Sequence, residues 1–323
     1  MKRFLIATTV LTVLLLGGAI AVIYPAQRAD LGWRPAVRPA SFAGEHSPNV
    51  VIDAAHHNAS DARWWGRYWP FAKLLRSDGY RVRTGESRFD ASSLAAVDVL
   101  VIANASGGAK PQFFGINLPV GGASDRAAPA FTAAEIAALR TWVEQGGSLL
   151  LIADHAPFGA ANRELAAVFG VTMGAGFVEV PDGKSDPLPF SRGNRRLGSH
   201  PILDGGSGLK RIDRLETFTG QSLQGPPGAT ILMALPRGSE EYIDDGSGAL
   251  KPVPALPAQG LAFAFGRGRI VVLGEAAMLT AQVAEGVPFG MDTTRNDNEV
   301  FALAVLHWLS GADKEHTRQD ATR

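Results

Sequence analysis

The sequence contains no cysteine in its 323 residues. Disulfide bonds and a thiol nucleophile are therefore excluded, so any covalent catalysis has to use oxygen, nitrogen or a metal ion. Disulfides are not needed for stability, because 46% of the residues are hydrophobic and a chain of this length can bury a large core.

An excess of charge of either sign is also missing. The chain has 31 basic and 31 acidic residues, which gives a formal net charge of zero. It has no run of lysine and arginine that could neutralise a line of phosphates. These two observations argue against nucleic acid as a partner.

A long hydrophobic run occupies residues 1–24. Lys2 and Arg3 precede mostly apolar, uncharged residues, which is the pattern of an export signal. The run is long enough to span a bilayer, so we expect a membrane anchor, although Ala19-Ile20-Ala21 has the form of a cleavage site. The positive flank predicts that the rest of the chain faces the periplasm or exterior, anchored to the inner membrane or secreted if the signal is cleaved.

The remaining sequence predicts one α/β domain over residues 49–310. Residues 25–48 are expected to be a linker or a segment wrapped over the domain, and residues 311–323 a disordered tail. Apolar strands alternate with helical segments, which predicts a doubly wound, mostly parallel sheet with helices on both faces. An antiparallel hairpin around residues 266–268 and a C-terminal helix that begins near Asp297 complete this fold.

Helix signals are clearest after Thr132. This residue can cap a helix, Glu135 completes a capping box, and the glycines at 146 and 147 end the helix. Another helical stretch, residues 64–80, is expected to be interrupted near Pro70. The glycine-rich loop 107–129 is a candidate lid, since it leaves the carboxyl end of a strand.

Polar residues follow four of the predicted strands at the point where each strand ends. In an open α/β sheet, ligands bind at this carboxyl edge. The four groups, in chain order, are Asp53, His56, His57 and Asn58; Asn104 and Ser106; Asp154 and His155; and Glu275, Thr280 and Gln282.

Three of these residues are candidates for catalysis. Asp154 could act as an acid or base, or it could cap a helix that begins near Pro157. His155 suits acid–base work or metal ligation, because imidazole titrates near neutral pH. Glu275 follows a buried-type strand, so it needs either an ion-pair partner such as an arginine or a raised pKa.

The other strand-end residues are candidates for ligand binding: His56, His57, Asn58, Asn104, Ser106 and Gln282. At most one of the two adjacent histidines can face the site easily, and Asn104 with Ser106 could instead close a turn. No cofactor is predicted. If a metal is present, zinc or iron held by His56, His155 and Asp154 is the candidate, although no spaced metal-binding motif occurs.

The order of elements resembles the class I glutamine-amidotransferase-like superfamily, and within it the trehalose-utilisation-like branch and exported bacterial proteins of unassigned function. The matching segments are WVEQGG, ADH, HPIL and GRGRIVVLGEAAMLTAQ, within residues 49–310. The resemblance implies a flavodoxin-like or amidotransferase-like fold with a site at the strand ends. Where that superfamily has a nucleophilic cysteine this chain has Asp154 or His155, and Glu275 is followed by alanines. The resemblance therefore implies no glutaminase activity, but gives a hint of carbohydrate ligands.

Three classes of function follow from these patterns. The first is an extracytoplasmic domain that binds a small polar molecule or glycan. The second is a hydrolase, with or without a metal, that uses Asp154, His155, His56 and Glu275. The third is a scaffold module of the cell envelope. Binding is the leading expectation, and hydrolysis is the main alternative.

Overall fold

A computed structural model describes residues 27–58, 62–109, 112–113, 116–117, 125–244 and 246–312. The predicted anchor (1–24), most of the tail and much of the candidate lid lie outside these ranges. In the described part of the chain, no helix has the length and apolar character required to cross a membrane.

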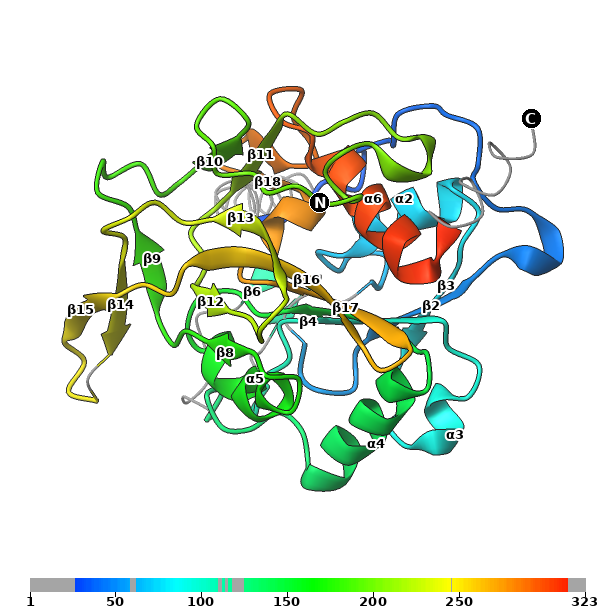
Figure 1. Cartoon of the computed structure of the whole chain (residues 1–323), viewed down its shortest axis with the longest axis horizontal. Helices are drawn as coiled ribbons and strands as arrows, with labels where there is room; N and C mark the ends of the chain where they lie inside the picture. The colour runs from blue at the N-terminus through cyan, green and yellow to red at the C-terminus, as the bar shows by residue number, and fades with distance from the viewer. Residues whose placement is uncertain are drawn as a thin grey trace, which may run out of the picture.

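A nine-stranded mixed sheet forms the centre of the molecule (Figure 1). Five neighbouring strands are parallel: β3 (Arg81–Gly85), β2 (Asn49–Asp53), β4 (Val99–Ala103), β7 (Ser148–Ile152) and β17 (Gly268–Leu273). The rest are antiparallel: β16 (Ala258–Phe265), β12 (Leu223–Gln224), β8 (Thr172–Met173) and β13 (Thr230–Ala234). The predicted hairpin is confirmed, because β16 pairs with β17 around Gly266 and Arg267.

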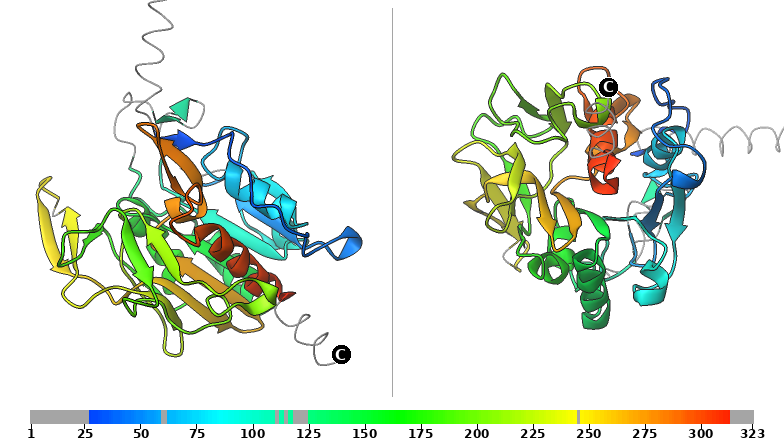
Figure 2. Two further views of the ribbon diagram at one scale, coloured as in Figure 1. Left: turned by 90° about the horizontal axis from the view of Figure 1, so that it is seen from above. Right: turned by 45° about the vertical axis from the view of Figure 1, so that its right-hand side comes forward.

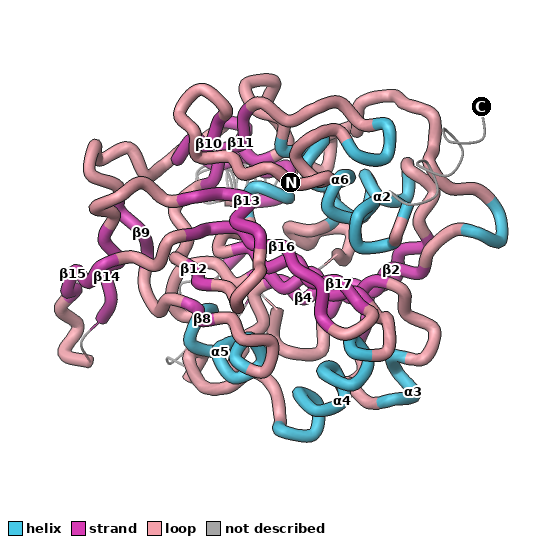
Figure 3. The backbone as a smooth tube through the Cα atoms, viewed as in Figure 1, coloured by secondary structure: helices cyan, strands magenta, loops and turns pink. Residues whose placement is uncertain are grey.

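Helices cover both faces of this sheet (Figure 3). One layer contains α2 (Trp69–Ser77) and α6 (Asn298–Ser310), and the other contains α3 (Ala91–Leu94), α4 (Ala133–Glu144) and α5 (Phe158–Ala167). The side chains of strand β4 alternate between the two layers. Val99 and Val101 face the first core and Leu100 and Ile102 the second, as the alternation of side chains along a strand requires. A fully apolar strand is therefore buried on both sides.

Two helix predictions can be compared directly with the structure. Helix α4 begins after Thr132, whose hydroxyl accepts from the Glu135 amide in the expected capping box. The prediction for residues 64–80 was wrong at Pro70. This proline lies in the first turn of α2, where its missing N–H costs nothing, so it starts the helix and does not interrupt it.

Smaller sheets and hairpins surround the centre (Figure 2). They comprise β1 (Arg28–Ala29), β18 (Ala281–Ala284) and β19 (Val287–Gly290); β9 (Phe177–Glu179), β14 (Glu240–Asp244) and β15 (Leu250–Pro254); β10 (Leu188–Ser191) and β11 (Arg214–Thr217); and β5 (Gln112–Phe113) and β6 (Ile116–Asn117).

Residues 27–48 pack along the domain. Strand β1 pairs with β18, the side chain of Trp33 is buried in the core, and the amides of Ser41 and Phe42 donate to the Asp78 carbonyl. Because β18 and β19 form a hairpin, this N-terminal segment extends a small sheet at the carboxyl edge of the main sheet.

Candidate functional site

A pocket of about 690 Å³ lies at the carboxyl ends of β4, β7 and β17. Its lining includes residues that follow each of these strands: Asn104, Asp154, His155, Phe158 and Ala277. The other walls come from Gln27, Arg67, Arg126, Asp186, Phe218, Phe289 and Arg295. A larger groove of about 1240 Å³ lies beneath residues 33–38, and none of the predicted site residues lines it. The strand-end pocket is therefore the candidate site.

Two hydrogen bonds fix the position of Asp154 in this pocket. Its backbone N–H donates to Asn104 Oδ1 at 2.9 Å, and its carboxylate accepts from the His155 amide at 2.8 Å. Helix α5 begins at Phe158, four residues later, with Pro157 at its N-cap position and no side-chain cap, so the capping interpretation of Asp154 is wrong. The side chain is available for chemistry in the pocket instead.

Burial raises the pKa of Asp154 above its ordinary value. The positive charge and amide of His155, the amide of Ala276 and the guanidinium of Arg67 oppose this rise but do not cancel it. Asp154 is half-buried, so the carboxyl group both resists ionisation and remains in contact with the pocket.

Glu275 is a completely buried carboxyl group near Asp154. It accepts from the backbone amides of Ala277 at 2.6 Å and Met278 at 2.8 Å. Burial, with the added negative charge of Asp154, raises the pKa of Glu275 well above its usual range. The expected arginine partner is not part of this arrangement, so the raised pKa is the alternative that the structure supports.

His155 is exposed at the rim of the pocket. Its Nδ1 lies 2.9 Å from the carbonyl oxygen of Ala156. A carbonyl only accepts, so Nδ1 carries a proton and, in the neutral ring, Nε2 carries the lone pair. His155 can therefore exchange a proton through Nε2.

Three further residues of the pocket were missed from sequence: Arg67, Arg126 and Asp186. Burial raises the pKa of Asp186, whose negative charge in turn raises that of Glu275. Arg67 lies in the aromatic-rich segment WWGRYW and Asp186 before Pro187 in an irregular loop, so neither stood at a strand end. For Arg67 the available signal was a charged residue among aromatic residues, which is weak alone.

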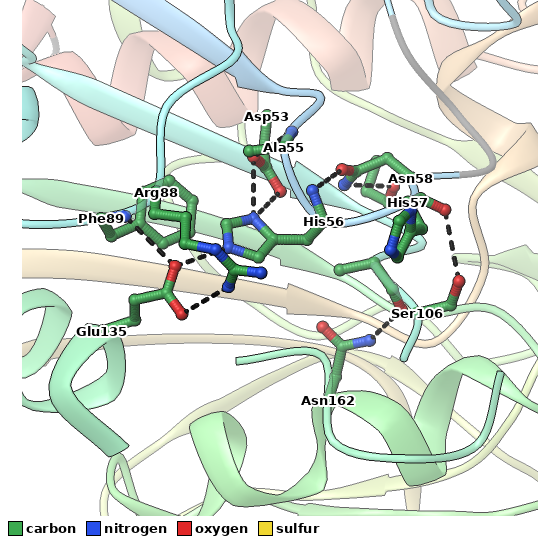
Figure 4. A network of polar contacts seen from close by, with 12 residues as sticks. Asp53, Ala55, His56, His57, Asn58, Arg88, Phe89, Ser106, Glu135 and Asn162 are labelled. Carbon is green, nitrogen blue, oxygen red and sulfur yellow. Dashed lines mark hydrogen bonds and ion pairs between the residues drawn. The ribbon is translucent and has the colours of Figure 1, made fainter. Parts of the chain in front are cut away.

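His56 belongs to a separate buried network (Figure 4). Its Nδ1 lies 2.9 Å from Asp53 Oδ2, and its Nε2 lies 2.8 Å from Glu135 Oε1. Arg88 adds an ion pair to Glu135 at 3.1 Å. Burial alone would lower the pKa of His56, but its two carboxylate partners outweigh burial and raise it. This network joins β2 to α4 and does not line the pocket.

The remaining candidates mostly shape turns. Asn58 accepts from the His56 amide and donates to the Ala103 carbonyl, and the Ser106 hydroxyl donates to backbone carbonyls of His57 and Gly108. Gln282 is buried and accepts from the Gln27 side chain. His57 is exposed at a positive φ of 49°. Of the six predicted ligand-binding residues, the pocket lining includes Asn104.

The proposed metal ligands are not brought together. Both ring nitrogens of His56 are bonded to carboxylates, whereas Asp154 and His155 lie in the pocket. Throughout the part of the chain that the structure describes, no group of three or more His, Asp or Glu side chains is arranged to hold a metal ion.

Part of the candidate lid falls outside the described residues, namely 110–111, 114–115 and 118–124. Arg126, near the end of the 107–129 loop, lines the pocket. Its guanidinium carbon lies 5.0 Å from the centre of the Phe158 ring.

Similar solved structures include one with a TM-score above 0.5, which shows a shared fold. The chain is similar to the mmIFT52 N-terminal domain at 14% identity, with a TM-score of 0.54 and coverage of 81% of this chain and 97% of that one. It also matches ThuA-like proteins from Bacteroides uniformis (13% identity, TM-score 0.45, 84% and 95% coverage) and Parabacteroides merdae (14%, 0.42, 84% and 90%). No protein-family model and no curated protein matches the sequence.

Proposed function

We propose that this chain is a hydrolase that binds a small polar molecule in the strand-end pocket and uses Asp154 as a general base. The main support is the carboxyl pair at the pocket, in which Asp154 contacts the cavity and Glu275 is buried, both with raised pKa values. Paired acids with perturbed pKa values in a cleft are typical of catalytic sites, because isolated buried carboxyl groups cost stability.

The two carboxyl groups are suited to different tasks. Glu275 is completely buried, whereas Asp154 is half-buried and contacts the pocket, so the negative charge of the pair is placed on Asp154 and Glu275 keeps its proton. The pair then carries one negative charge, on the residue that contacts the pocket. A carboxylate whose pKa is raised toward the working pH is a better base than an ordinary aspartate.

The proposed step is hydrolysis by an activated water. An O–H bond of the water breaks and its proton passes to the Asp154 carboxylate. The water oxygen bonds to the electrophilic atom of the substrate as the bond to the leaving oxygen breaks. That oxygen takes a proton from His155, when its ring is protonated, or from solvent.

Binding without turnover is the second candidate function. The pocket combines aromatic walls, Phe158, Phe218 and Phe289, with hydrogen-bonding groups, as ligand sites generally do. Glycans are among the ligands that we propose for such a site. The order of strands and helices also supports our proposal that the chain is a distant member of the amidotransferase-like superfamily.

The test is hydrolysis by the full-length chain of p-nitrophenyl esters, glycosides and phosphate, with Asp154→Asn compared with wild type. We expect the variant to lose roughly 10²–10⁴-fold in rate, the usual contribution of a general base. Asp182→Asn, on an exposed loop, is the control. An active wild type with an equally active Asp154→Asn variant would contradict the role of Asp154. A wild type that binds pocket ligands but turns over none would instead identify a binding domain.

A further inference from the structure

Two arginines on the pocket wall have side-chain N–H donors without a hydrogen-bond partner among the described residues. The Nε atoms of Arg67 and Arg126 are both buried and have no hydrogen-bond partner among the residues that the structure describes. Both arginines line the pocket that contains Asp154. A buried donor left open costs free energy unless a ligand or water fills it.

The same arginines are partly removed from solvent. Burial lowers the pKa of both guanidinium groups, yet arginine stays charged at neutral pH. A desolvated cation is stabilised when an anion approaches it. The nearby Asp154 carries one negative charge against the two guanidinium groups, and its carboxylate already accepts from the His155 amide.

The surroundings of Arg126 favour an oxyanion with two acceptor oxygens. Its guanidinium lies over the Phe158 ring, and this contact restrains the orientation of its plane. The apolar rings of Phe158, Phe218 and Phe289 in the wall reduce the competition from water. A guanidinium group in such a site recognises a carboxylate or phosphate through two parallel hydrogen bonds.

We propose that Arg67 and Arg126 form an oxyanion-binding subsite, so that the small molecule held beside Asp154 carries a carboxylate or phosphate group. This inference rests on the proposed function and names its substrate class. Arg295, exposed at the pocket mouth, adds a third positive charge that would attract such a molecule.

The test compares ligands that share one ring and differ in charge. Glucose, glucuronate and glucose 6-phosphate are titrated by calorimetry into the full-length chain, and acetate and inorganic phosphate serve as minimal oxyanions. We expect at least one sugar anion to bind ~10-fold or more tightly than glucose. The carboxylate and phosphate arms identify which oxyanion the subsite prefers.

The variants Arg126→Gln and Arg67→Gln should each weaken anion binding by about tenfold or more, because each removes a charged donor. Arg163→Gln, on the exposed face of α5, is the matched control. Melting temperatures show whether each variant is folded, and either arginine variant alone suffices for the test.

The proposal is overturned if glucose binds as tightly as the anions, or if folded arginine variants bind the anion like wild type. It is also overturned if none of the four anions binds at about 50 mM, a concentration that detects even millimolar affinity. Asp154→Asn should retain anion binding. Loss of turnover in that variant with anion binding intact would therefore support both proposals, and failure of one can be told from failure of the other.

Discussion

Asp154 and Glu275 are stabilised by consecutive backbone amides of one turn. The Ala276 amide favours the ionised form of Asp154, whereas the amides of Ala277 and Met278 donate to Glu275. Tyr68 fixes this turn, because its buried hydroxyl donates to the Ala276 carbonyl at 3.1 Å. The chain segment after β17 thus links the two carboxyl groups, although they follow different strands.

This arrangement predicts how stability should depend on pH. The pKa of Glu275 is raised in the folded state above its ordinary value of 4.5, so the folded chain keeps a proton that the unfolded chain releases. The stabilisation from this proton is fully present below about pH 4.5 and is lost as the pH rises through the folded-state pKa. Glu275→Gln, which cannot ionise, should therefore lose less stability than wild type between pH 5 and pH 8.

Urea denaturation at the two pH values measures this difference. We expect Glu275→Gln to be less stable than wild type by about 1–3 kcal/mol at both pH values. A glutamine side chain offers one acceptor oxygen, whereas the backbone amides of Ala277 and Met278 each need an acceptor. Glu164→Gln on the exposed face of α5 should keep the wild-type slope. An unchanged slope in Glu275→Gln would show that Glu275 is ionised in the folded chain.

The buried His56 network predicts a stability effect without an effect on the pocket. His56→Ala leaves the carboxylates of Asp53 and Glu135 buried without their shared partner, and removal of one partner of a buried ion pair costs about 3–5 kcal/mol. His57→Asn is the control, because His57 is exposed and asparagine tolerates its positive φ. Equal stability of the two variants in urea would contradict this role of His56.

The same network also has a defined pH window. Burial opposes ionisation of Glu135, but hydrogen bonds from Thr132 and His56 outweigh it and lower its pKa to about 2. The ionised Glu135 carboxylate stabilises the folded chain above pH 4.5, its ordinary pKa, and this stabilisation is lost as the pH falls toward 2. The pKa of His56 is raised, so its stabilisation is present below 6.5 and is lost as the pH rises. The destabilisation of His56→Ala should therefore be largest between about pH 4.5 and 6.5.

Asp78 should control how firmly residues 27–48 are attached. This buried carboxylate accepts from the Ser41 hydroxyl at 2.8 Å and lies 2.7 Å from His307 Nε2. Asp78→Ala leaves both groups without this acceptor, so the segment should detach more often. We expect faster chymotryptic cleavage after Phe42, which neighbours Ser41, in native conditions.

Asp182→Ala, in an exposed loop, is the control for Asp78→Ala. Other contacts also hold the segment, among them the pairing of β1 with β18, the ion pair of Arg38 with Glu299 and the bond from Lys73 to the Trp33 carbonyl. Cleavage at the wild-type rate in Asp78→Ala would mean that the remaining contacts keep residues 27–48 in place without the Asp78 carboxylate.

Local signals in the sequence predicted the elements well. The capping box of Thr132 and Glu135 and the turn at Gly266 need only neighbouring residues, so periodicity and capping rules identified them. The strand-end rule likewise placed Asn104, Asp154 and His155 at one pocket. These three were predictable because the position of a residue at a parallel strand end determines the edge that it occupies.

Contacts between distant residues could not be predicted in this way. His56 follows β2 and has the appearance of a site residue, but its partner Glu135 is 79 positions away and draws it into the core. Glu135 itself was identified only as part of a helix cap. Arg126 lies in a loop whose path the sequence does not specify. Pairing of this kind depends on tertiary packing, which no local pattern encodes.

The position of Gln27 has a practical consequence for experiments. This residue lines the pocket, and its side chain donates to Gln282 in the hairpin that forms part of the pocket wall. An affinity tag or fusion partner joined directly before Gln27 would stand at the entrance, where it could obstruct ligands or occupy the cavity. Fusions placed after α6 would leave that entrance open and would be the safer choice for every binding assay.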